Sequence, residues 1–151
     1  MNLFITLVPF IALISFSSAG IGGRLQKYRV KGQFFCQQTP SKAYGISVRL
    51  VDEDDLGPDD NMAETTTDEE GRFVLEGQER ELTNIDPELK IYHDCNDRDA
   101  TGLASNMPCQ RKWKLTLPDL YINGNNSTEI MDIGRINLEL ILPSEERDCI
   151  H

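Results

Sequence analysis

Apolar and polar residues alternate along much of this chain, which is the pattern of β-strands with one buried and one solvated face. Around position 30, Tyr28, Val30 and Phe34 alternate with charged and amide side chains. Turn-forming residues separate the alternating runs, and the only segment that allows a short helix is 96–109. About seven such strands predict an all-β fold, a β-sandwich of two packed sheets. Six of the expected strands lie at 28–34, 46–50, 73–75, 89–92, 113–117 and 136–142.

The first 19 residues differ from the rest of the chain. They carry no charged side chain, contain an apolar run over 3–16, and end in Ser17-Ser18-Ala19. The run is shorter than the roughly 20 residues that span a bilayer, and small residues at its end suit signal peptidase. We therefore expect a secretory signal peptide over 1–19, one domain over 20–151, and a secreted, extracellular product.

The charge is strongly acidic, with 25 acidic and 15 basic residues and a net charge of −10. This balance argues against nucleic acid as a partner and against general affinity for anionic membranes. Between Asp52 and Glu70 the chain has ten acidic residues and no basic one. Asp52, Asp54 and Gly57 fit positions 1, 3 and 6 of an EF-hand loop, but Ala63 occupies position 12, where that loop has its glutamate. We assign no metal or cofactor and leave two alternatives for 52–70, a solvated acidic loop or a looser calcium site.

Four cysteines, Cys36, Cys95, Cys109 and Cys149, are an even number in a chain expected to be exported. Disulfides are the default in that compartment. No pair has CxxC spacing, so zinc and thioredoxin-type chemistry are not indicated. From the count alone, three connectivities remain open.

Several short motifs, taken in order with all four cysteines, resemble the nematode transthyretin-like family. The resemblance covers nearly the whole mature chain and implies a secreted, transthyretin-like β-sandwich whose members mostly lack a defined biochemical role. The motifs are Val30-Lys31-Gly32 leading to Cys36, Val48-Arg49-Leu50-Val51-Asp52, Thr67-Asp68-Glu69-Glu70-Gly71-Arg72-Phe73, Ile91-Tyr92-His93-Asp94-Cys95-Asn96, Asp132-Ile133-Gly134-Arg135-Ile136-Asn137-Leu138 and a final Cys149.

This fold suggests how the cysteines pair. Cys95 ends one expected strand and Cys109 begins the next, so antiparallel pairing of those strands predicts a Cys95–Cys109 bridge. In transthyretin-like topologies the first and last long strands run side by side and parallel, which predicts the second bridge, Cys36–Cys149.

The resemblance also raises one enzymatic alternative, because related sandwiches include hydroxyisourate hydrolases. Those enzymes use histidines, an arginine and a C-terminal Tyr-Arg-Gly-Ser motif, whereas this chain ends Arg147-Asp148-Cys149-Ile150-His151. Its only other histidine, His93, shares the parity of Leu89 and Ile91, so we expect a buried ring satisfied by hydrogen bonds at the strand end. Hydrolase and phosphate-loop motifs are missing from the sequence, and we expect no enzyme.

Two surface features remain. Parity places Trp113 inward and Lys112 and Lys114 outward, so these lysines, with Arg111, could form a small basic edge for lipid phosphates. One branch of the family is associated with bridging phosphatidylserine on dying cells to a phagocyte receptor. Asn125 and Asn126 begin overlapping sequons and predict one N-linked glycan.

The sequence therefore predicts a secreted, non-enzymatic extracellular binding protein whose partner, a protein or a small ligand, is unknown. A phosphatidylserine-binding adaptor is the first alternative. A hormone-like carrier, which would need a tetramer channel, and a hydroxyisourate-hydrolase-like enzyme are the others. The oligomeric state is left open.

Overall fold

A computed structural model describes residues 23–54, 57–98, 109–123 and 129–149. In these ranges the chain forms a three-stranded sheet of order β4-β1-β7 and a five-stranded sheet of order β3-β2-β5-β6-β8. The strands are β1 Arg24–Phe35, β2 Ser47–Asp52, β3 Asp60–Thr66, β4 Arg72–Glu81, β5 Pro87–His93, β6 Gln110–Thr116, β7 Met131–Asn137 and β8 Glu146–Asp148, with 3-10 turns η1 Pro40–Ala43 and η2 Asp119–Tyr121.

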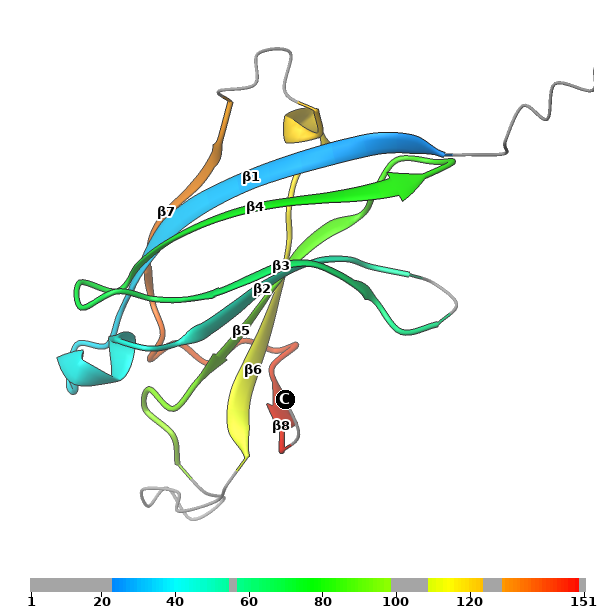
Figure 1. The fold of residues 1–151 in the computed structure, drawn as a ribbon. Helices are drawn as coiled ribbons and strands as arrows, with labels where there is room; N and C mark the ends of the chain where they lie inside the picture. Colours follow the sequence, from blue (N-terminus) through cyan, green and yellow to red (C-terminus); the bar gives the residue numbers. More distant parts are fainter. Residues whose placement is uncertain (1–22, 55–56, 99–108, 124–128, 150–151) are drawn as a thin grey trace, which may run out of the picture.

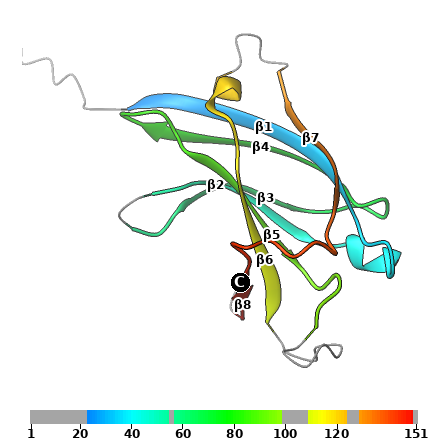
Figure 2. The same cartoon turned by 180° about the vertical axis from the view of Figure 1, so that it is seen from behind.

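The two sheets pack face to face as a sandwich, which confirms the predicted all-β class (Figures 1 and 2). β1 and β4 form a long antiparallel pair above the five-stranded sheet, and β7 runs parallel to β1. β5 lies at the centre of the second sheet, antiparallel to both β2 and β6.

The core consists of the inward side chains that the alternation predicts. Tyr28, Val30 and Phe34 of β1 have no exposed surface, and Trp113 of β6 is 1% exposed. Phe34 stacks on Phe73 of β4, with ring centroids 5.1 Å apart. Each fully buried side chain of this size contributes about 1.5–3 kcal/mol by leaving water.

Two strands were not predicted, and one was misplaced. β3 lies within the acidic run, where an edge strand tolerates charged side chains that discourage pairing with other chains. β8 has only three residues. The expected strand at 136–142 is wrong beyond Asn137, because Leu138 turns into the core while Leu140 and Ile141 are exposed.

The predicted disulfide pairing is wrong. The bonds are Cys36–Cys95 and Cys109–Cys149, with Cα–Cα distances of 5.9 and 4.0 Å. The expected strand pairs do form, antiparallel β5–β6 and parallel β1–β7. However, β8 joins the free edge of β6, and its last residue Asp148 faces Gln110, so Cys149 falls beside Cys109. Cys95 then bonds to Cys36 at the end of β1, which joins the two sheets.

Some predictions fall on residues outside the described ranges. These are the signal peptide over 1–19, most of the possible helix in 96–109, the sequons at Asn125 and Asn126, and His151. Among the described residues, no helix has the length and hydropathy required to cross a membrane.

Removing either disulfide should lower the free energy of unfolding by roughly 4 kcal/mol, because each closes a loop of 59 or 40 residues in the unfolded chain. Urea unfolding of Cys36→Ala/Cys95→Ala and of Cys109→Ala/Cys149→Ala measures both effects. A non-reducing peptide map should recover the 36–95 and 109–149 linkages. Recovery of a 95–109 or 36–149 linkage would contradict this connectivity.

Candidate functional site

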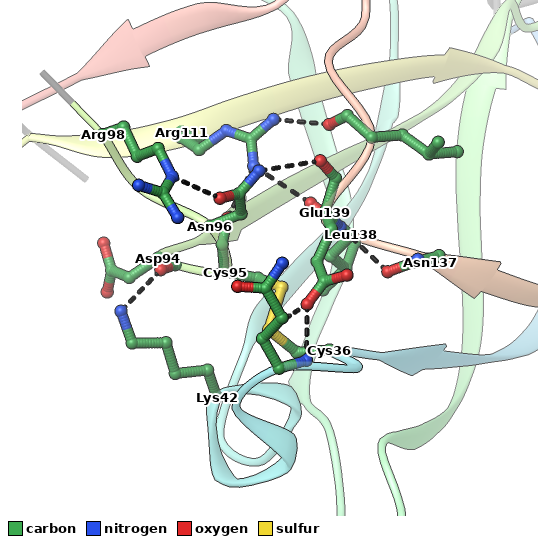
Figure 3. The surroundings of a disulfide bond; sticks show 12 residues. Cys36, Lys42, Asp94, Cys95, Asn96, Arg98, Arg111, Asn137, Leu138 and Glu139 are labelled. Carbon is green, nitrogen blue, oxygen red and sulfur yellow. Dashed lines mark hydrogen bonds between the residues drawn. A yellow bond between two sulfur atoms is a disulfide. The ribbon is translucent and has the colours of Figure 1, made fainter. Parts of the chain in front are cut away.

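Arg111 is the most constrained side chain in the described structure. It is 2% exposed, and its five N–H groups all donate: Nε and Nη2 to the Glu145 carboxylate, Nη1 to the Cys95 and Leu138 carbonyls, and Nη2 also to the Leu140 carbonyl. Figure 3 shows this guanidinium beside the Cys36–Cys95 disulfide. A buried charge is tolerated when every donor has a partner, so Arg111 is a structural residue.

The predicted basic edge is therefore altered. Arg111 cannot contact lipid from its buried position, and that part of the prediction is wrong. Lys112 lies 3.5 and 3.6 Å from the Glu146 and Asp148 carboxylates, and Lys114 lies 2.9 Å from Glu146. The two lysines do face outward, but carboxylates of β8 lie against both.

Trp113 completes the cluster around Arg111. Its indole Nε1 donates to Glu145 at 2.9 Å, and its inward position is as predicted. Burial raises the pKa of Glu145, but hydrogen bonds from Arg111 and Trp113 outweigh it and hold that pKa below its usual value. Glu145 is thus ionised at neutral pH and supplies the negative charge that pairs with Arg111. Sequence alternation gave no signal for this residue.

His93 is buried as predicted, at 1% exposure, and meets Trp113 edge to face at 4.9 Å. The expected hydrogen bonds are wrong: neither ring nitrogen has a partner among the described residues. Burial of the ring, together with the positive charge of Arg111, lowers the pKa of His93 to about 3. The imidazole is neutral at pH 7 and closed to solvent, which does not suit an acid–base catalyst.

Several acidic residues of 52–70 make separate local contacts. Asp52 accepts a hydrogen bond from the backbone of Asp86 at 2.6 Å, Asp59 pairs with Lys90, and Glu64 pairs with Arg49. Asp68 accepts from two backbone N–H groups in the turn before β4. In the described part of 52–70, these carboxylates are not gathered around one point.

One group of potential metal ligands lies close together among the described residues, Cys36, Cys95 and Glu139. Its two sulfur atoms form the disulfide, which leaves a single carboxylate. Glu139 instead accepts a 2.6 Å hydrogen bond from the backbone of Gln38. This cluster fixes the chain around the disulfide and offers no site for a metal ion.

The outer face of the three-stranded sheet has a different character. Two adjoining hollows of about 400 and 490 Å³ share Gln33 and Arg135. Arg72 and Val74 of β4 line the first hollow, and Val74 is 60% exposed. This face is the best candidate for a binding surface in the described structure. The sequence did not single it out, although glycine inside the 132–138 motif is a known signal of a β-bulge.

Replacing Arg111 by methionine should lower the free energy of unfolding by about 3–5 kcal/mol, because it leaves the half-buried Glu145 carboxylate and three backbone carbonyls without their donor. Lys114→Met is the control on the same strand: its pair with Glu146 is on the surface and should cost about 1 kcal/mol or less. Chemical denaturation measures both. Equal losses would show that Arg111 does not organise this region.

Replacing His93 by leucine should stabilise the protein by about 1–3 kcal/mol at pH 7, since an unsatisfied buried polar group is removed. The effect should grow in acid. Unfolded histidine binds a proton below pH 6.5, whereas folded His93 stays neutral down to about pH 3. The wild-type free energy of unfolding therefore decreases as the pH is lowered from 6.5 towards 3. At pH 5 this group alone accounts for a loss of about 2 kcal/mol relative to neutral pH.

The measurement is urea unfolding of both proteins at pH 7 and pH 5. Other groups titrate in both proteins, so the difference between them isolates His93. If the difference is the same at both pH values, the buried ring is not the cause.

Sequence comparisons place the chain among known proteins. The family model described as Transthyretin-like family matches residues 31–118. Transthyretin-like protein 5 of Caenorhabditis elegans is 42% identical over 96% of this chain and 99% of its own length. Transthyretin-like proteins 33 and 2 of the same organism are 42% and 36% identical, over 83% and 85% of this chain and 83% and 86% of theirs. The predicted resemblance is confirmed, and the chain belongs to the transthyretin-like family.

Proposed function

We propose that this protein is a secreted extracellular binding protein that works without catalysis. The leader over 1–19 supports secretion, and the family to which the chain belongs supports a shared sandwich scaffold. The observation that carries the proposal is the outer face of the three-stranded sheet, where two adjoining hollows of about 400 and 490 Å³ open to solvent. The partner is an extracellular protein or a small ligand.

The state of His93 supports the absence of catalysis. General acid–base catalysis requires a titratable group within hydrogen-bond reach of substrate and a pKa near the working pH. His93 is 1% exposed and has a pKa of about 3. The hydrolase alternative gains no support from this residue.

The lipid-adaptor alternative gains less support than the sequence suggested. Arg111 is enclosed, and carboxylates of Glu146 and Asp148 lie against Lys112. Each lysine near an anionic membrane contributes roughly 1 kcal/mol only when its charge is free to approach lipid.

The proposal can be tested with the mature, oxidised protein immobilised and exposed to the extracellular fluid of its source. Val74→Glu places a charge in the hollow without disturbing the core. Gln78→Glu adds the same charge on the same face of β4, four residues away. We expect the immobilised protein to retain a partner that soluble wild-type protein displaces. The His93→Leu variant should retain the same partner. The Val74→Glu variant should retain at least tenfold less of it than the Gln78→Glu variant.

Equal retention by the two β4 variants would remove this face as the binding surface. Conversion of a captured small molecule to a new product, abolished by His93→Leu, would contradict the non-catalytic proposal.

A further inference from the structure

An irregularity in β7 determines which side chains lie on the outer face. Lys31 of β1 faces Asp132, and two residues later Gln33 faces Arg135, so β7 contains one extra residue between these pairs. Gly134 lies in the bulge with φ 73°, and its N–H donates to Asp132 at 2.8 Å. A one-residue shift moves a strand's following side chains to the opposite face. The bulge therefore turns Arg135 from the core side to the outer face of the sheet.

Arg135 then completes a row across all three strands. Gln33 faces Arg72 of β4 on one side and Arg135 of β7 on the other. Side chains at paired positions of adjacent strands are neighbours on the same face. Two guanidinium groups thus flank one amide, with Lys31 in the next row and Val74 facing it. The same residues line the 400 Å³ hollow.

The guanidinium of Arg135 has no carboxylate partner within the described part of the chain. Its guanidinium carbon lies 4.6 Å from the centre of the Phe35 ring, and no carboxylate of the described chain pairs with it. Stacking on a ring leaves the planar N–H fork free to bind a carboxylate. Arg72 pairs with Glu70 at 3.4 Å, and both side chains are more than half exposed. Such exposed pairs exchange partners at little cost.

The surroundings favour one kind of ligand. The two hollows share Gln33 and Arg135 and extend from Val74 to Pro40 and Ala43, an elongated and open surface. Small ligands are usually enclosed over most of their surface, which an open groove cannot provide. Exposed Val74 offers an apolar contact beside the cations, which a sulfated polysaccharide would not use.

We propose that the row Arg72–Gln33–Arg135 binds carboxylate side chains of an extended acidic segment in a partner polypeptide, with Val74 contacting an apolar residue of the same segment. Alternate residues of an extended segment face the same way, so an acid and an apolar residue two positions apart can contact the sheet together. This inference rests on the proposed function and specifies the partner's chemistry at the same face.

The test uses fluorescence polarisation with the mature, oxidised protein and a labelled peptide of sequence Glu-Ser-Val-Ser-Glu-Ser-Val. We expect Arg135→Gln to weaken binding at least tenfold and Arg135→Lys severalfold, because lysine keeps the charge but loses the planar fork. Glu70→Gln, which frees Arg72, should tighten binding. Arg80→Gln is the matched control. Arg80 is an exposed arginine of β4, eight residues after Arg72, and its replacement should change the affinity less than twofold.

A peptide with glutamine in place of both glutamates should not bind. The inference is overturned if that peptide binds equally, if Arg135→Gln matches Arg80→Gln, or if heparin fragments or octanoate bind at this row while the acidic peptide does not. Circular dichroism of each variant checks that the fold is retained. If the acidic peptide fails but retention of a partner still depends on Val74, only the partner's chemistry is wrong. If both fail, the proposed function fails with it.

Discussion

The five donated hydrogen bonds of Arg111 are the constraint on which the rest of this sandwich depends. Their acceptors lie just after the end of β5 at Cys95, in the segment that follows β7, and at Glu145 just before β8. The segment after β7 has to cross from the three-stranded sheet to the five-stranded one. Arg111 binds the carbonyls that no strand partner satisfies during that crossing. Because the charge is buried, the arrangement is stable only when all of these partners are in place.

The bonds that hold the two sheets together are gathered at the end of the molecule where Arg111 lies. The Cys36–Cys95 bond joins β1 to the five-stranded sheet, and Cys109–Cys149 joins β8 to β6 in the same region. His93 lies within this cluster, and neither of its ring nitrogens has a hydrogen-bond partner among the described residues. Its ring stays neutral because burial, and then the positive charge of Arg111, lower its pKa. The row Arg72–Gln33–Arg135 on the outer face of the three-stranded sheet contributes none of these bonds. It is therefore free to vary in its side chains without loss of the fold, as binding surfaces on rigid scaffolds do.

Sequence reasoning predicted the parts of the fold that follow a regular period. The inward positions of Val30, Ile91 and Trp113 follow from alternation and are buried. β3 was missed because its residues are polar, and β8 because three residues carry no period. The run 136–142 alternates like a strand, but the carbonyls of Leu138 and Leu140 bind Arg111 instead of a neighbouring strand. Without β8, the cysteines could not be paired correctly. Alternation could not predict the row that contains Arg135, because a bulge in β7 reverses which of its following side chains face outward.

We infer that disulfides and the hydrogen bonds of Arg111 hold one end of the sandwich rigid, and that the outer face of the three-stranded sheet binds the partner. Both parts can be measured by hydrogen–deuterium exchange of the mature protein with and without the acidic peptide. We expect slow exchange around 93–95 and 111–113 in both states, and added protection on binding at 31–35, 72–74 and 132–135. Added protection confined to β6 and β8, or fast exchange around Arg111 in the free protein, would overturn this inference.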